Sequence, residues 1–371
     1  MKFMHLSDLH LGIRIGEVSL IEDQEYILNR LLETAESERI DTVIIAGDIY
    51  DKSIPSAEAT RLFDDFLTGL AAGGYTVIIT SGNHDSAERL AYAGRLLENR
   101  NIYISPVFNG PPDPVTLKDE YGNVDIYPLP FLKTAHIKKA LQNDEIENTC
   151  DGIKLILENL QMNPSSRNIL VAHQFVTGAV SSDDIIVGGT DNVDASLFSK
   201  FDYTALGHIH GPQNIGGPSV RYCGSPLKYS FSEARHVKTA TIIELHEKGA
   251  VNVYESPLSP LRDMRELKGS YFDITAKSSY EGTQTDDYMH ITLTDEEDIP
   301  DVIGKLRSIY PNTLRVDYDN RRTRENNLIT GYSESKSPLE LFEEFYELQN
   351  NAPMTKEQIS FAKSLMDEIW I

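Results

Sequence analysis

The sequence predicts an α/β protein over residues 1–255, and two features of the chain lead to this prediction. Short runs of apolar and β-branched residues recur along it, and each run ends at polar residues. Helical patterns, such as those over residues 22–39 and 57–71, separate the runs. Continuous apolar strands that alternate with helices are typical of sheets buried on both faces. We therefore expect a functional site in the loops at the C-terminal ends of the strands.

Three runs are the clearest of the expected strands. They are Thr42–Ala46, Thr76–Thr80 and Asn168–Ala172, and each is rich in isoleucine, valine or leucine. Such residues favour strands because their side chains pack well on a pleated surface.

The pattern changes after residues 256–260, a segment that contains two prolines. Beyond it we expect separated strands at 271–275, 288–294 and 313–319, with a helix near 299–309. This arrangement is typical of a small α+β cap.

Two amphipathic helices are expected at the C-terminal end of the chain. Ser337 with Glu340, and Thr355 with Gln358, have the spacing of capping boxes, which open helices. The apolar residues of these two helices are Leu339, Phe342, Phe345, Tyr346, Ile359, Ala362, Leu365, Met366, Ile369 and Trp370.

A chain of 371 residues exceeds the usual size of one compact domain, which is about 150 residues. Apolar residues make up 40% of the chain and charged residues 25%, as in folded globular proteins. We expect three domains: an α/β domain over 1–260, a cap over 261–330 and a helical tail over 331–371.

The cysteine count and the distribution of apolar residues indicate the cellular compartment in which the protein is expected. Cys150 and Cys223 are too few for a disulfide framework, which favours a reducing environment. Asp8 and His10 interrupt the apolar residues near the N-terminus, so we expect no signal peptide. No run approaches the ~18 apolar residues that cross a bilayer. The protein is expected to be cytoplasmic and not inserted in a membrane.

The formal net charge of −23 argues against a protein that binds DNA tightly by itself, since such proteins neutralise phosphates with lysine and arginine. A divalent-cation site can still attract phosphate locally, because a bound cation is often the largest charge in a site. The charge therefore weakens an interaction with nucleic acid and does not exclude it.

Five short motifs follow expected strands and contain ligands suited to divalent metals. Each motif alone could occur by chance. Chance does not readily explain five motifs in this order, which together contain five of the ten histidines. Carboxylate, amide and imidazole groups suit Mn²⁺, Fe²⁺ or Zn²⁺, and the absence of cysteine favours a manganese-like site over a structural zinc site. The motifs are Asp8-x-His10, Gly47-Asp48-x-x-Asp51, Gly82-Asn83-His84-Asp85, Ala172-His173 and Gly207-His208-x-His210.

In this order the motifs resemble those of the calcineurin-like metallophosphoesterase superfamily. The stretches Ser7–Gly12 and Tyr222–Glu233 narrow the resemblance to the SbcD-type nuclease subunits of bacterial SbcCD complexes, whose relatives process DNA breaks. The resemblance is strong over residues 1–240. It implies a four-layer αββα sandwich with a small α+β cap and a helical tail, and a Mn-type phosphodiesterase that uses two metal ions to cleave DNA.

The resemblance also implies a role for each motif residue. Asp48 would bridge the two metal ions, so its removal should abolish the binding of both ions. One metal set would comprise Asp8, His10, Asp48 and His210, and the other would comprise Asp48, Asn83, His173 and His208.

Three further motif residues are expected to support the site. In the family, the counterpart of His84 contacts the phosphate and helps to protonate the leaving oxygen as a general acid. The carboxylates of Asp51 and Asp85 are expected to orient imidazole rings. Protein phosphatases of the superfamily have an arginine where this chain has Lys52, so hydrolysis of phosphomonoesters is less well supported.

Residues outside the motifs allow fewer conclusions. His5, His136, His236, His246 and His290 match no ligand position and are given no role. Arg315, Arg321, Arg322 and Arg324 form a basic cluster that either touches DNA or balances nearby acids.

The helical tail carries three lysines and eight acidic residues, a net charge of −5, which does not suit DNA. Its apolar residues either pack on the cap or bind a partner as helices in a groove. The corresponding tail of the resembled family binds an SMC-like ATPase subunit, and that family usually forms homodimers. We expect residues 331–371 to bind such an ATPase.

Two other functions compete with a DNA nuclease. A stand-alone phosphoesterase of the same fold would act on small or cyclic nucleotides, but such enzymes rarely need a cap and a tail. A non-enzymatic subunit would have lost site residues, whereas every expected ligand type is present here.

Overall fold

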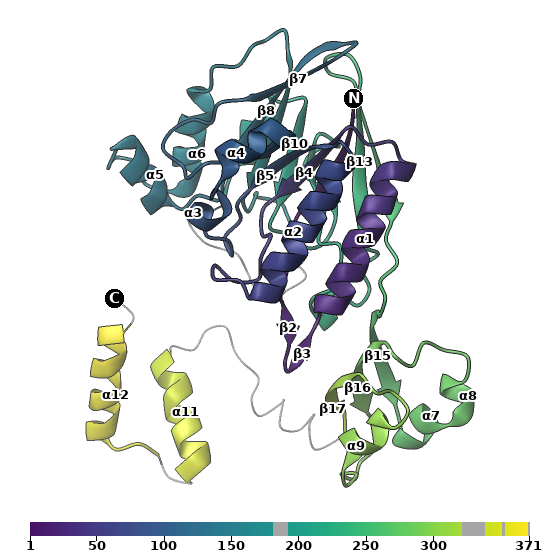
Figure 1. Ribbon diagram of the computed structural model, residues 1–371. Helices are drawn as coiled ribbons and strands as arrows, with labels where there is room; N and C mark the ends of the chain where they lie inside the picture. Colours follow the sequence, from purple (N-terminus) through teal and green to yellow (C-terminus); the bar gives the residue numbers. More distant parts are fainter. Residues whose placement is uncertain (181–191, 321–337, 351–352, 370–371) are drawn as a thin grey trace. The chain divides into compact units, whose positions relative to one another are not determined.

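The computed structural model describes residues 1–180, 192–320, 338–350 and 353–369 (Figure 1). The chain divides into two compact units. The first comprises residues 1–267, 275–291 and 301–316, and the second comprises 268–274, 292–300 and 317–371. The expected domain boundaries near residues 260 and 330 stay a prediction.

Two six-stranded sheets form the centre of the first unit. The strands of the first sheet are, in spatial order, β14 (Val251–Pro257), β13 (Thr239–Leu245), β1 (Lys2–Leu6), β4 (Thr42–Ala46), β5 (Thr76–Thr80) and β6 (Ile102–Ile104). Those of the second are β11 (Gln213–Asn214), β12 (Val220–Tyr222), β10 (Tyr203–Gly207), β9 (Arg167–His173), β8 (Gly122–Leu129) and β7 (Val115–Asp119). A small hairpin is formed by β2 (Arg14–Ile15) and β3 (Val18–Ser19).

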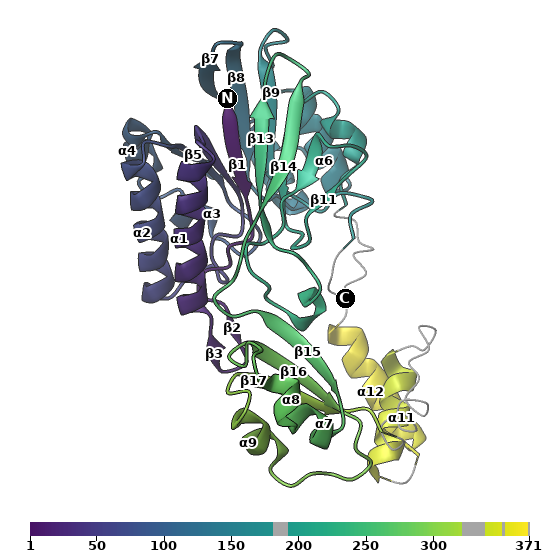
Figure 2. The same cartoon turned by 90° about the vertical axis from the view of Figure 1, so that its right-hand side faces the viewer.

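Helices cover the outer faces of the two sheets. Figure 2 shows α1 (Ile21–Ser37) and α2 (Ala57–Ala72) on one side and α6 (Thr149–Glu158) on the other. This is the four-layer αββα arrangement that the resemblance implied, and that expectation is confirmed. The shorter helices of this unit are α3 (Ala87–Leu90), α4 (Gly94–Leu97) and α5 (Thr134–Leu141), with 3-10 turns at Glu98–Arg100, Ala195–Phe198 and Phe231–Glu233.

Alternating side chains of the buried strands fill separate apolar layers. In β4, Val43 and Ile45 belong to the core beneath α1 and α2, whereas Ile44 and Ala46 belong to the core between the sheets. Because successive side chains of a strand point to opposite faces, a strand covered on both faces must be apolar at every position. This explains the continuous apolar runs that predicted the strands.

One element of the cap differs from the prediction made from the sequence. Residues Tyr271–Thr275, expected as a strand, form helix α7. The Ser270 Oγ atom accepts a hydrogen bond from the Asp273 backbone N–H at 3.1 Å, which favours a helix start despite the β-prone residues that follow.

The cap sheet has three strands, of which two were expected. They lie in the order β15 (Met264–Gly269), β16 (Tyr288–Leu293) and β17 (Thr313–Tyr318). The expected helix near 299–309 is α9 (Val302–Arg307), and a short α8 spans Lys277–Tyr280. Arg315 lies on β17, whereas Arg321, Arg322 and Arg324 lie outside the described residues.

Both expected tail helices are present, as α11 (Pro338–Asn350) and α12 (Lys356–Ile369). The capping box at the start of α12 is confirmed: the Thr355 N–H donates to Gln358 Oε1 at 2.8 Å, and the Gln358 N–H donates to Thr355 Oγ1 at 3.3 Å. Ser337 and Trp370 lie outside the described residues. Among the helices that the structure describes, none is both long and apolar enough to cross a membrane.

Candidate metal centre

The five sequence motifs meet at one edge of the paired sheets. Strands β1, β4 and β5 are parallel neighbours, so the loops that follow them emerge side by side. In the second sheet, β9 and β10 are also parallel neighbours. These loops bring together all seven expected metal ligands, which are Asp8, His10, Asp48, Asn83, His173, His208 and His210.

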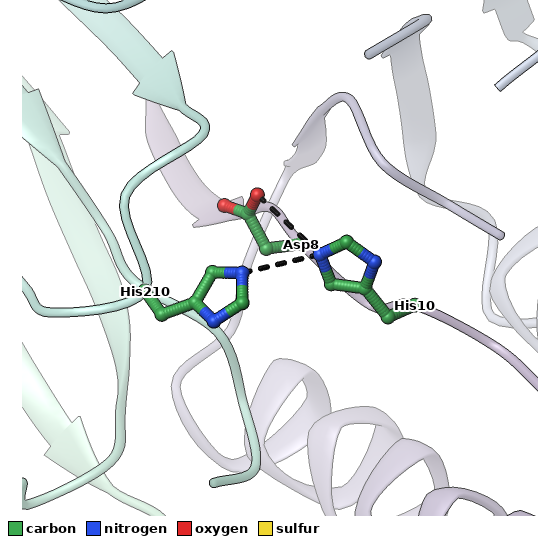
Figure 3. Close-up of side chains that lie close together, drawn as sticks. All are labelled: Asp8, His10 and His210. Atoms are coloured by element: carbon green, nitrogen blue, oxygen red, sulfur yellow. Dashed lines mark hydrogen bonds and ion pairs between the residues drawn. The ribbon is translucent and has the colours of Figure 1, made fainter. Parts of the chain in front are cut away.

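Asp8, His10 and His210 form the first ligand group (Figure 3). The Nε2 atoms of His10 and His210 are 3.2 Å apart, and His10 Nε2 lies 4.0 Å from Asp8 Oδ1. Figure 3 shows the two imidazole rings directed towards each other with the carboxylate beside them. One potential ligand atom of each residue lies within 4.8 Å of those of the other two, a spacing that suits a single cation.

Asp48 lies between the two expected ligand sets. Its Oδ2 atom is 3.7 Å from His10 Nε2 and 3.3 Å from His173 Nε2. One carboxylate oxygen therefore approaches a histidine of each set, as a bridging ligand would.

The remaining ligands of the second set surround Asn83. Its Oδ1 atom lies 3.0 Å from His173 Nε2 and 2.9 Å from His208 Nδ1. His173 also groups with Asp8 and Asp48 at ligand spacing. The structure thus brings the second set together as well.

His84 lies at the exposed side of the centre. Its Nδ1 atom donates a hydrogen bond to the main-chain oxygen of Asp51 at 2.8 Å. Its ring centroid is 4.8 Å from that of His10, and it also groups with His10 and Asp48 at ligand spacing. The side chain is therefore close enough to bind a cation, and its assignment to proton transfer stays a prediction.

The ligand loops have an unusual backbone. Asp8, His10, Asp48 and His208 have φ angles of 53°, 43°, 51° and 102°, in the region that side chains other than glycine rarely adopt. Each such residue costs on the order of 1–3 kcal/mol and persists only where the surrounding structure imposes it. The fold therefore fixes these ligands in place.

Close backbone approach explains the glycine in two motifs. A Cβ atom on Gly207 would lie 2.0 Å from the Ala46 carbonyl oxygen, and one on Gly82 would lie 2.1 Å from Asp48 Oδ1. Neither position has space for a side chain. Gly207 lets loops of the two sheets approach each other, and Gly82 lets the loops after β4 and β5 lie against each other.

Burial and charge set the protonation of the histidines. Burial lowers the pKa of His10 to about 3, although Asp48 opposes the shift, and it lowers the pKa of His208 to about 4. Burial alone would raise the pKa of Asp48, but the nearby His173 holds it below its usual range. A carboxylate and neutral imidazoles are the forms that bind metal ions.

Hydrogen bonds leave imidazole nitrogens available at the centre. The Nδ1 atoms of His173 and His210 donate to the Ala46 carbonyl at 2.8 Å and to Glu233 Oε1 at 2.9 Å. Burial alone would lower the pKa of both rings, but Asp48 raises the pKa of His173 to about 9 and Glu233 raises that of His210. Each ring therefore holds a proton more tightly than a free imidazole does, and it must release that proton from Nε2 when a cation binds. With only oxygen and nitrogen donors, the residues fit a pair of divalent cations.

Glu233 is a site residue whose role the sequence did not reveal. It is fully buried, and its second carboxylate oxygen forms an ion pair with Lys238. The Lys238 Nζ atom also donates to the His210 main-chain oxygen at 2.9 Å. The sequence showed Glu233 only as part of a family-like stretch, and nothing local to it indicates a contact with His210.

Asp51 and Asp85 make other contacts than the predicted carboxylate–imidazole hydrogen bonds. The carboxylate of Asp85 accepts hydrogen bonds from the backbone N–H groups of Ile49, Tyr50 and Gly82, so it holds two motif loops together. Burial raises its pKa to about 6. Asp51 contacts His84 through its main-chain oxygen rather than its carboxylate.

Two families match parts of the chain. The family described as calcineurin-like phosphoesterase matches residues 1–212, which include all the ligand motifs. The family described as type 5 capsule protein repressor C-terminal domain matches residues 260–350.

A protein of Staphylococcus epidermidis, named as the D subunit of the nuclease SbcCD, is 31% identical over 383 aligned residues, covering 100% of this chain and 99% of its own. A solved structure from Thermus thermophilus has a TM-score of 0.41 at 11% identity, covering 68% of this chain and 98% of its own. A dimetal phosphatase from Danio rerio also has a TM-score of 0.41, at 12% identity, covering 70% and 98%. The sequence matches alone decide the family: the chain belongs to the calcineurin-like phosphoesterases and, within them, to the SbcD-type subunits.

Proposed function

We propose that this protein is a DNA nuclease that hydrolyses phosphodiesters with two divalent cations, at a site of the manganese type. The observation that carries the proposal is the convergence of five separate motifs on one group of oxygen and nitrogen ligands. A full-length relative named as a nuclease subunit supports DNA as the substrate.

The residues present would hold two cations around Asp48. When bound, two such cations supply the activation of water and the neutralisation of charge on the phosphate. The first set is Asp8, His10, Asp48 and His210, and the second is Asp48, Asn83, His173 and His208.

His84 acts on the substrate in this proposal. Its Nδ1–H is engaged by the Asp51 carbonyl, so Nε2 is the atom that hydrogen-bonds the phosphate and delivers a proton to the leaving oxygen. Its exposure at the edge of the centre gives a DNA strand access to it.

We further propose that the protein works as a homodimer with an SMC-like ATPase, in the cytoplasm, where it processes DNA ends and hairpins during repair, recombination and replication. The relative's name, which denotes one subunit of a complex, supports a partner. Exposed apolar residues on α11 and α12 suit residues 331–371 to bind it. The free cysteines suit a reducing compartment.

Cleavage of linear duplex and single-stranded DNA, with and without the ATPase subunit, tests the activity. We expect Mn²⁺-dependent cleavage by the wild type. A protein that hydrolyses cyclic nucleotides but neither form of DNA would contradict the nuclease assignment.

His84→Ala tests the proposed general acid. We expect cleavage to slow by ~10²–10⁴-fold, because proton transfer typically contributes that factor, while Mn²⁺ binding stays at two ions. His246→Ala, which changes a histidine far from the ligand motifs, serves as the control. Wild-type cleavage rates, or loss of a bound ion, would show that His84 has another role.

A further inference from the structure

A cavity of about 640 Å³ adjoins the candidate metal centre, a size within the range of small-molecule sites. Asn83, a proposed metal ligand, lies in its wall. The other lining residues relevant here are Phe108, Phe131, Lys133, His136 and Lys139.

Phe131 is shared between the cavity and the metal ligands. Its ring stacks on His208, with centroids 6.4 Å apart and an interplanar angle of 26°, and it meets His173 edge-on at 6.2 Å. Its backbone N–H donates to the Ser81 carbonyl at 2.8 Å, which holds this wall to the loop after β5. Only the ring of Phe131 therefore separates a group bound in the cavity from His173 and His208.

The cavity carries positive charge in a strongly acidic chain. Lys133 and Lys139 are exposed and form no ion pair with any residue that the structure describes, and His136 lies between them on α5. The two acids of the lining are engaged with the protein: Asp85 by three backbone N–H groups and Glu88 by the Ser86 hydroxyl at 3.1 Å. Unpaired lysines beside aromatic rings are the combination with which proteins hold single-stranded nucleic acid.

We propose that this cavity is a subsite for the nucleotide next to the cleaved phosphodiester. The base packs against the half-buried Phe108, and the following phosphate lies against Lys133 and Lys139. Stacking of this kind tolerates any base, because every base has an aromatic face. The inference rests on the proposed function and adds to it how the protein holds its strand.

Three chromogenic phosphodiesters test the base contact: methyl p-nitrophenyl phosphate, and the 5′- and 3′-(p-nitrophenyl phosphate) esters of thymidine. We expect the full-length Mn²⁺ enzyme to hydrolyse one thymidine ester with a kcat/KM at least about tenfold above that for the methyl ester. Phe108→Ala should reduce this preference, and Phe108→Tyr, which keeps the ring and the fold, should retain it.

The outcomes separate the two proposals. Hydrolysis of the methyl ester without any preference for a thymidine ester would overturn the subsite and leave the metal centre intact. An unchanged preference in Phe108→Ala would do the same. Failure of the wild type to hydrolyse even the methyl ester with Mn²⁺ would overturn the proposed function, and the subsite with it.

An oligothymidylate tests the cationic part. The double variant Lys133→Ala/Lys139→Ala should cleave it with a kcat/KM about tenfold lower at low salt, and with a weaker dependence on salt, because fewer counterions are displaced. Lys154→Ala, which removes an exposed lysine of α6 outside the cavity, is the matched control. Equal losses in the double variant and the control would show that the two lysines do not hold the strand.

Discussion

Glu233 is a single buried carboxylate outside the motifs that orients His210, a proposed metal ligand. One oxygen holds the His210 ring at 2.9 Å, and the other is paired with Lys238. Lys238 is anchored in turn by the Ser225 hydroxyl at 2.8 Å. The orientation of His210 therefore depends on residues that follow it in the chain by up to 28 positions.

Substitution of Glu233 should weaken metal binding. We expect Glu233→Ala to lower Mn²⁺ affinity by about 10–100-fold, since partners that orient metal-binding histidines have effects of this size. Glu233→Gln should retain more affinity, because its amide oxygen still accepts from His210 Nδ1. Titration calorimetry measures both, and wild-type affinity in the alanine variant would show that His210 needs no such support.

Asp48→Ala should abolish binding at both metal positions, because Asp48 is the one residue assigned to both ligand sets. Calorimetry with Mn²⁺ and measurement of nuclease activity check this. Asp113→Ala, which removes an exposed acid that belongs to none of the motifs, should still bind two ions. Two ions bound at near-native affinity by Asp48→Ala would rule out the bridging role.

At the scale of elements, the regular strands could be predicted and the irregular ones could not. β4 and β5 are runs of apolar residues buried on both faces, a pattern visible in the sequence. β12 has three residues, which is too short to show a period. In α7, local capping by Ser270 overrode residues that favour strands.

The same distinction holds for the candidate site. The convergence of the motif residues could be predicted, because parallel strands bring the loops that follow them to one edge of the sheet. The contact of Glu233 with His210 and the cavity beside Phe131 depend on tertiary packing between distant segments. No periodicity or spacing in the sequence records such contacts.

Strand β1 carries a buried histidine that should make stability depend on pH. Burial lowers the pKa of His5 to about 3, whereas the unfolded chain titrates near 6.5. Between these values the unfolded chain takes up a proton and the folded protein does not. The free energy of unfolding should therefore fall as the pH falls from about 6.5 towards 3, by up to about 1.4 kcal/mol per pH unit from this group.

Chemical denaturation of the metal-free wild type and His5→Gln checks this pH dependence. The wild type should lose more stability than the variant between about pH 6.5 and 4.5, and the difference should be constant above about pH 8, where histidine is neutral in both states. Equal losses in the two proteins would show that His5 is not the titrating group.

For the whole molecule, the net charge of −23 means that the proposed binding of DNA must depend on local features and on partners. The lysines beside the metal centre supply one local attraction. The tail is the candidate for a partner surface: Phe342 and Phe345, one helical turn apart on α11, are 39% and 58% exposed. Apolar side chains with this spacing are typical of helices that bind in a groove.

Deletion of residues 331–371 should leave hydrolysis of methyl p-nitrophenyl phosphate intact and prevent stable assembly with the ATPase, because the segment contains none of the proposed ligands. Phe342→Ala/Phe345→Ala should reproduce the loss of assembly, and Tyr121→Ala, another exposed aromatic, should not. Co-purification and model-substrate assays measure both effects. If the truncated protein still co-purified with the ATPase at full stoichiometry, the tail would not be the surface that binds the ATPase.

The position of β1 in its sheet has a consequence for synthesis on the ribosome. β1 is translated long before β13, yet it lies between β4 and β13, with Lys2 paired to Glu244. A nascent chain therefore lacks one neighbour of β1 until residues 239–245 have emerged, after every proposed ligand has been translated. We therefore expect the loop after β1, which contains Asp8 and His10, to take its final conformation only after β13 has paired, so a translation product that ends before β13 should lack a complete metal centre.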